Sequence, residues 1–299
     1  MQHEIRNIND WVVFLTQIDL PVLKKTADEI GRLRGMEDRI TGKDISAVIL
    51  RDPLMTIKVL RFIESRRKTE GAEITTISHA LMMMGTGSFF EHFSHLGAVE
   101  DLLAEHPVAL SGMLSVVSRS RHAALYAQDW SILRRDMESD EVTIAALLHD
   151  MAEILLWCYS PGHLVEIRRR MMRDPSLRSL DTQKAVIGFD FLKLQMLLAA
   201  VWKLPALLRQ LMDTNHAHLP RVVNVNLATA LARHSALGWH NAALPDDYAA
   251  INAFLNIGEE AVMHNINRNA LAAAREWRWY NGRPAAAWFP LLPGDWPVI

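Results

Sequence analysis

Cysteine is nearly absent from this sequence. Cys158 is the single cysteine among 299 residues, so no disulfide can form within the chain. It follows Leu155, Leu156 and Trp157 in an apolar run, where a structural thiol is more common than a reactive one. We therefore interpret Cys158 as a core residue.

The chain also lacks an excess of charge of either sign. Its formal net charge is −2, with 50% hydrophobic and 22% charged residues. Without an overall basic field there is little to attract nucleic acid, so we expect no nucleic-acid partner. The alternative is single-stranded nucleic acid stacked on the tail indoles beside Arg275, Arg278 and Arg283. The hydrophobic fraction is ordinary for a globular protein, which argues against general disorder.

Long uninterrupted apolar runs are missing as well. The segment Met1–Asp10 is polar and has no signal-peptide core. We identify 189–208 as the longest apolar stretch, and Asp190, Lys193 and Lys203 interrupt it, which disfavours a membrane span. The expectation is a soluble, cytoplasmic protein with no membrane partner.

Strand-like alternation is scarce, whereas helix signals recur. Thr41 and Asp44 resemble a capping pair, and Asp52 followed by Pro53 is typical of an N-cap and first helical residue. Thr75 or Thr76 can cap the next helix, which ends at Gly85. Apolar periodicity predicts further helices near 108–128, 140–158, 161–173, 182–200, 204–214, 222–236 and 246–272.

These patterns predict an all-α fold. No repeat or Gly/Ser-rich linker divides the chain, so we expect packed subdomains. We place an N-terminal helical subdomain at 1–105, a helical bundle at 106–272 and a C-terminal extension at 273–299. Aromatic and proline residues crowd this extension, and so many indoles are costly to leave in water. We therefore expect the extension to fold back onto the body or onto a partner.

One pair of residues on the predicted helix 140–158 suggests chemistry. His149 falls on the apolar stripe facing the interior, with Asp150 next to it. His122, on the preceding predicted helix, would face them. Two imidazoles and a carboxylate suit a divalent transition metal such as Fe, Mn or Zn, and open positions on such a metal could activate water. The alternative is a hydrogen-bonded structural remnant.

His122 and the run 147–150 resemble the first histidine and the His-Asp doublet of the HD phosphohydrolase superfamily. Other pieces are similar, in order and spacing, to the HD-related output domain (HDOD) family across roughly 15–240: 49–54 with 58–60, 77–80 with Met84-Gly85, and 202–205 with Asn215-His216. The resemblance implies an HD-like bundle in a bacterial signalling protein.

The sequence also departs from the catalytic members of this superfamily. They carry a further aspartate on a later helix, where Thr229 stands near the corresponding position here. Many of them follow the doublet with glycine and lysine, whereas this chain has Met151, Ala152 and Glu153. An anionic side chain thus replaces one that could offset phosphate charge. Asp190 and Asp213 are the two candidate substitutes for the missing aspartate.

The resemblance therefore favours a non-catalytic signal-transduction module that acts through protein–protein contacts, with links to cyclic-dinucleotide or two-component pathways made in trans. We expect no cofactor and assign no catalytic residue. The rival hypothesis is a metal-dependent phosphohydrolase or phosphodiesterase with His122, His149 and Asp150 as ligands. The run Met82-Met83-Met84 is interpreted as core residues on a helix, with a plastic binding surface as the alternative.

Overall fold

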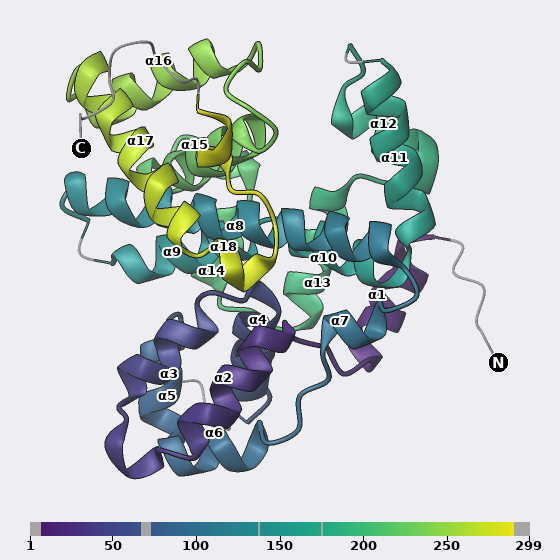
Figure 1. Ribbon diagram of the computed structural model, residues 1–299, viewed down its shortest axis with the longest axis vertical. Coiled ribbons are helices and arrows are strands. Elements are labelled where there is room, and N and C mark those ends of the chain that lie inside the picture. Colours follow the sequence, from purple (N-terminus) through teal and green to yellow (C-terminus); the bar gives the residue numbers. More distant parts are fainter. Residues whose placement is uncertain (1–6, 67–72, 137, 175, 290–299) are drawn as a thin grey trace, which may run out of the picture.

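The computed structural model describes residues 7–66, 73–136, 138–174 and 176–289. Within these ranges the chain forms helices and no β-strand, apart from one isolated parallel bridge between Val22 and Ala98. The all-α prediction is confirmed. In Figure 1 the N-terminal helices form a lower body, and the later helices lie across and above it.

In the lower body, the starts of two helices, α3 and α4, are as the sequence predicts. Thr41 and Asp44 form a reciprocal capping box at the start of α3. Asp52 caps α4 by accepting hydrogen bonds from the backbone N–H groups of Leu54 and Met55, at 2.8 and 3.2 Å. The other oxygen of Asp52 accepts from the N–H of Leu23 at 2.8 Å, which holds two helix starts together. The helices are α2 (Lys24–Arg34), α3 (Gly42–Ile49), α4 (Pro53–Arg66), α5 (Ile77–Met84), α6 (Thr86–His92) and α7 (Val99–Leu102).

The first helix does not stay with this body. α1 (Ile8–Gln17) packs against α13 (Phe191–Val201), which comes from the second half of the chain. A single hydrophobic core runs from Trp11 to Tyr280 through both halves. The predicted boundary near residue 105 therefore divides the sequence into two segments, but the two segments share one continuous apolar core.

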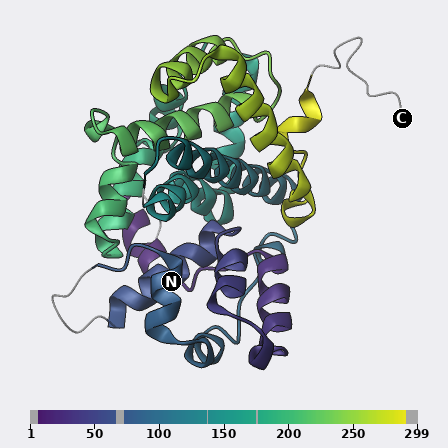
Figure 2. The ribbon, with the colours of Figure 1, turned by 90° about the vertical axis from the view of Figure 1, so that its left-hand side faces the viewer.

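The upper body is organised around α8 (Pro107–Leu133), whose Tyr126 and Trp130 are fully buried. Figure 2 shows this central layer between the N-terminal helices and the later ones. The helices packed around it are α9 (Ser139–Leu148), α10 (Met151–Tyr159), α15 (Pro220–Ser235) and α17 (Glu259–Arg275). The remaining helices are α11 (Pro161–Arg173), α12 (Ser179–Ile187), α14 (Ala206–Met212) and α16 (Leu244–Leu255).

Two of the long helices predicted from the sequence are each divided into two helices in the structure, so their prediction as single helices is wrong. The predicted helix 182–200 ends at Gly188 (φ 87°), and Asp190 caps the next helix, α13. The predicted helix 246–272 breaks at Asn256 (φ 53°) and Gly258 (φ 88°), between α16 and α17. Left-handed residues cannot continue a right-handed helix, so each break divides one apolar stripe into two differently directed helices.

The stretch 139–159, which contains α9 and α10, is long and apolar enough to cross a membrane by length and composition. The identification of 189–208 as the longest apolar stretch is therefore wrong. Within 139–159, 78% of the most apolar window is buried inside the protein, as expected for a core element.

The C-terminal extension folds back onto the body as far as residue 289, as predicted. α18 (Trp277–Tyr280) buries Tyr280, whose hydroxyl donates to the backbone oxygen of Arg51 at 3.0 Å. Beyond it, the Nε1–H of Trp239 donates to the backbone oxygen of Ala285 at 2.9 Å. The part of the extension from residue 290 on, with Trp296 and the prolines at 290, 293 and 297, lies outside the described residues.

Candidate functional site

His149 and Asp150 occupy the junction between α9 and α10 rather than the middle of one helix, so the prediction of a continuous helix 140–158 is wrong. Their side chains are 12% and 11% exposed, and Nδ1 of His149 lies 3.0 Å from Oδ1 of Asp150.

A side chain from another helix explains this break. In a regular helix the N–H of Ala152 would donate to the carbonyl of Leu148. Here the buried amide of Gln195, from α13, stands between them. Its oxygen accepts from the N–H of Ala152 and its NH2 group donates to the oxygen of Leu148, both at 2.8 Å. An inserted side chain that satisfies both backbone groups is a known cause of a helix kink.

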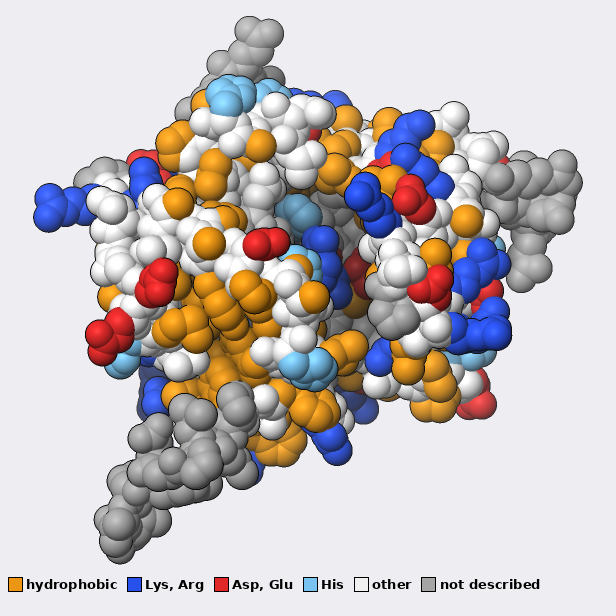
Figure 3. Space-filling view, turned by 90° about the horizontal axis from the view of Figure 1, so that it is seen from above, with side chains coloured by type: hydrophobic (Ala, Val, Ile, Leu, Met, Phe, Trp, Pro, Cys, Tyr) orange, Lys and Arg blue, Asp and Glu red, His pale blue; other side chains and the backbone are white. Residues whose placement is uncertain are grey.

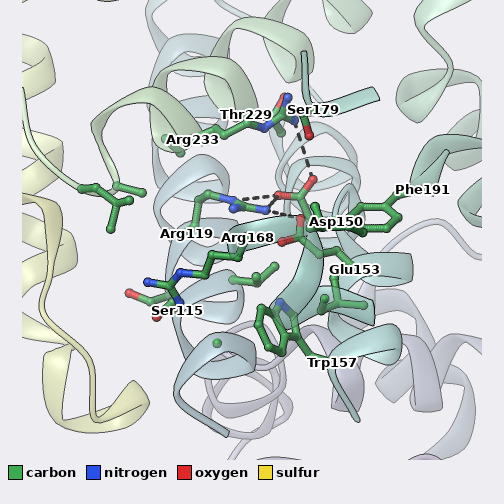
Figure 4. A pocket seen from close by; sticks show the side chains of 18 of the residues that line it. Ser115, Arg119, Asp150, Glu153, Trp157, Arg168, Ser179, Phe191, Thr229 and Arg233 are labelled. Atoms are coloured by element: carbon green, nitrogen blue, oxygen red, sulfur yellow. Dashed lines mark hydrogen bonds and ion pairs between the residues drawn. The ribbon is translucent and has the colours of Figure 1, made fainter. Parts of the chain in front are cut away.

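Arg119 of α8 holds the carboxylate of Asp150. Its Nε and Nη2 both donate to Oδ2 of Asp150, at 3.0 and 2.6 Å, and Nη2 also donates to Glu153 at 2.8 Å. The Arg119 side chain is 14% exposed. Figure 4 shows its guanidinium reaching both carboxylates, with Arg233 approaching Asp150 from above in this view.

The charges in this cluster stabilise one another. Burial opposes ionisation of Arg119, but the carboxylates of Asp150 and Glu153 raise its pKa above the ordinary value. Burial likewise favours the neutral form of Asp150, but Arg119, the hydrogen bond from His149 and Arg233 hold its pKa well below the usual range. Asp150 is therefore an anion whose charge is already matched by an arginine.

His122 lies deeper in α8. It is 4% exposed, stacks on Tyr126 with ring centroids 4.4 Å apart, and its Nε2 has no hydrogen-bond partner among the described residues. Burial lowers the pKa of His122 to about 3, so its imidazole is neutral near pH 7.

The remaining residues singled out from the sequence have local partners. The hydroxyl of Thr229 donates within α15, to the carbonyl of Val225 at 2.9 Å, and no carboxylate stands there. Asp190 caps α13 and Asp213 caps the short 3-10 helix η2 (Thr214–His216). Both candidate substitutes for the missing aspartate are thus helix caps.

This arrangement does not fit the metal site expected from the sequence. Among the described residues, no group of three or more His, Cys, Asp and Glu side chains is placed to hold a metal ion. Both carboxylate oxygens of Asp150 are engaged: Oδ2 accepts two hydrogen bonds from Arg119, and Oδ1 lies 3.0 Å from Nδ1 of His149. The metal site stays a prediction.

His122, His149, Asp150 and Thr229 nevertheless line one cavity of about 1550 Å³. α8, α10, α11 and α15 contribute to its walls together with the C-terminal extension. Figure 3 shows a deep cleft in the face seen from above, with basic and histidine side chains on its walls. The fold thus brings the predicted residues to one cavity. Arg119, which binds Asp150, and Gln195, which holds the junction between α9 and α10, were not predicted.

Comparisons with known proteins give the family. The MmoQ response regulator from Methylococcus capsulatus strain Bath has a similar structure, with a TM-score of 0.63 and 18% identity, covering 83% of this chain and 98% of that one. A virulence factor from Campylobacter jejuni subsp. jejuni has a TM-score of 0.64 and 18% identity, covering 92% and 98%. These likenesses show the fold, and no curated protein sequence matched. The model of the HDOD domain matches residues 20–218, and the chain belongs to the HDOD family.

Proposed function

We propose that this protein is a non-catalytic signal-transduction module that acts through contacts with other proteins. The observation that carries the proposal is the pairing of Arg119 with Asp150, by two hydrogen bonds of 3.0 and 2.6 Å. Arginine keeps its charge at any physiological pH, so Asp150 has a permanent cationic partner. The retained His-Asp doublet then stabilises the junction between α9 and α10.

The energetic argument follows from burial. A metal at Oδ2 of Asp150 would have to displace the Arg119 guanidinium, which is 14% exposed and has no other acid than Glu153 within ion-pair distance among the described residues. A buried charge that loses its only partner typically costs about 3–5 kcal/mol, and Arg119, which would keep Glu153, should lose part of that amount. Metal binding at this position would therefore have to offset that cost.

An exposed apolar surface supports the part of the proposal that concerns protein partners. Met82 and Met83 of α5 are 81% and 65% exposed, so their interpretation as core residues is wrong. Exposed methionines are typical of adaptable protein-binding surfaces. We propose a partner in bacterial signalling, reached in the cytoplasm and acting in trans, in a cyclic-dinucleotide or two-component pathway.

The rival function remains a metal-dependent phosphohydrolase or phosphodiesterase. One observation favours it: His122, His149 and Asp150 line the same cavity, which has room for a substrate. It requires these three ligands to close on an Fe, Mn or Zn ion after Arg119 has moved.

Metal analysis and turnover of the purified protein separate the two functions. Our proposal predicts less than stoichiometric Fe, Mn and Zn, and no hydrolysis of bis(4-nitrophenyl) phosphate when these metals are added. His149→Ala and Asp150→Ala should then lower stability alone. The control is Asp247→Ala, because Asp247 also pairs with a histidine, His234 at 2.6 Å, but lies outside the cavity. Stoichiometric metal that is lost in both site variants but kept in the control, together with turnover, would establish the enzyme instead.

A further inference from the structure

The cavity at the His-Asp doublet is larger than the site that the doublet forms. Its volume is about 1550 Å³, above the few hundred to about 1,000 Å³ of most small-molecule pockets. Its lining includes the doublet, residues of α11 and residues of the C-terminal extension. If His149 and Asp150 served only to stabilise the junction between α9 and α10, a cavity of this volume beside them would not be needed.

The unpaired charge in this cavity is positive. Four arginines and three carboxylates line it, which leaves a net charge of +1. Arg119 lies between Asp150 and Glu153, and Asp190 is a helix cap. Three further arginines line the cavity from three different segments: Arg168 of α11, Arg233 of α15 and Arg283 of the extension. Figure 4 shows the first two among the lining side chains.

These arginines have little to neutralise them. Arg168 and Arg283 have no carboxylate within ion-pair distance among the described residues, and Arg233 reaches only Asp150, at 3.9 Å. Guanidinium groups at the wall of a partly enclosed cavity bind anions well, because planar N–H donors meet carboxylate or phosphate oxygens in pairs.

Rings and orphaned polar atoms complete the lining. Trp157, Phe191 and Trp288 contribute aromatic surface. Two buried ring nitrogens on the cavity wall, Nε1 of Trp157 and Nε2 of His122, have no hydrogen-bond partner among the described residues. Unpartnered buried polar atoms are uncommon, and these two belong to residues that line the cavity.

We propose that this cavity binds an organic anion with an aromatic ring, a phosphate monoester in chemical class. Arg168 and Arg233 supply the charge that holds the phosphate, and the aromatic side chains contact the ring. The inference rests on the proposed function, because a ligand bound here without being hydrolysed would be the signal that the module senses.

The test uses 1-naphthyl phosphate as the probe, with the full chain and EDTA present, and isothermal titration calorimetry as the readout. Arg168→Gln and Arg233→Gln should each weaken binding about tenfold or more, the range expected for a lost charged hydrogen bond. The matched control is Arg169→Gln. Arg169 is the next residue on α11, pairs with Glu166 at 2.7 Å and does not line the cavity. It should bind the probe like the wild type.

Two ligand controls separate charge from ring. 1-Naphthol and inorganic phosphate should each bind at least about tenfold more weakly than 1-naphthyl phosphate, because each lacks one half of the contacts. A weakening in one arginine variant alone would support the anion site and overturn the part of the proposal that gives the other arginine a phosphate contact. Equal binding of 1-naphthol, or wild-type affinity in both arginine variants, would overturn it.

Failure of this inference and failure of the proposed function are distinguishable. No binding of the probe would sink the ligand site and leave the non-catalytic role standing. Binding followed by release of phosphate when metal is restored would support the cavity as an anion site and refute the non-catalytic role.

Discussion

Arg119 and Asp150 come from different helices and meet at one carboxylate oxygen, Oδ2, which accepts two hydrogen bonds from the guanidinium at 3.0 and 2.6 Å. Arg119 lies on α8 one turn before His122, so it enters the cavity from the same helix as the first histidine. A largely buried ion pair, with side chains 14% and 11% exposed, thus joins the doublet to an arginine.

Removing the guanidinium should be costly. Arg119→Met leaves Asp150 and Glu153 as neighbouring buried carboxylates with no strong cationic partner. We expect the free energy of unfolding to fall by about 3–5 kcal/mol, measured by urea denaturation near pH 7. Arg169→Met is the control. The Arg169 side chain, which pairs with Glu166, is 51% exposed, so this variant should lose less than about 1 kcal/mol of unfolding free energy. Equal losses in the two variants would contradict the account.

The burial of His122 predicts a dependence of stability on pH. Its pKa is lowered to about 3 in the folded protein from 6.5. Between these values the unfolded chain binds a proton that the folded chain does not. The unfolding free energy should therefore decrease as the pH falls below about 6.5, by up to about 1.4 kcal/mol per pH unit.

His122→Phe tests this origin. The substitution keeps a ring against Tyr126 and removes a buried nitrogen without a partner, so stability near pH 7 should change by less than about 1 kcal/mol. The slope between pH 6.5 and 4.5 should become shallower than in the wild type, in urea titrations at each pH. An unchanged slope would show that His122 is not the group responsible.

The amide of Gln195 should be needed for the junction between α9 and α10. Gln195→Met leaves the carbonyl of Leu148 and the N–H of Ala152 without their 2.8 Å partners. We expect a loss of about 2–4 kcal/mol in the free energy of unfolding, because each unsatisfied buried group costs about 1–3 kcal/mol. Gln210→Met, on the half-buried face of α14, serves as the control and should cost less than about 1 kcal/mol. A small effect of Gln195→Met would mean that the chain re-forms a regular helix there.

A close approach between α8 and α10 gives a further test. A Cβ atom at Gly112 would lie 2.6 Å from the ring of Trp157, which lines the cavity. Gly112→Ala should therefore cost about 1–3 kcal/mol and shift the tryptophan emission spectrum. Gly31→Ala is the matched change in α2, where no atom lies within 4 Å of the new Cβ. It should stabilise the protein by about 0.4–1 kcal/mol. Destabilisation in both would argue against the specific contact.

Local signals explain what the sequence predicted well. The capping box of Thr41 and Asp44 and the N-cap at Asp52 depend on residues within three positions of one another, so they could be identified without a fold. The breaks at Gly188 and Asn256 were missed because the apolar periodicity runs on across them. The sequence signal at both breaks is a glycine or asparagine, the residue types that most easily adopt the left-handed conformation, followed within a few residues by the start of a new helix.

The site was predicted less completely, and for a different reason. The family resemblance singled out His122, His149 and Asp150 together, and all three line one cavity. It could not show that Arg119 binds Asp150, since that pair depends on how α8 crosses α10. Gln195 is 43 residues from Ala152 and inserts into the backbone there, which no local pattern encodes.

The central claim is that Arg119, and not a metal ion, neutralises Asp150. The most direct measurement is the unfolding free energy of the wild type and of Asp150→Asn, each with added Mn²⁺ and each with EDTA. A ligand that binds the folded state stabilises it. We predict that Mn²⁺ leaves the wild type unchanged and that Asp150→Asn is destabilised equally in both conditions. Stabilisation of the wild type by Mn²⁺ that disappears in Asp150→Asn would contradict the account.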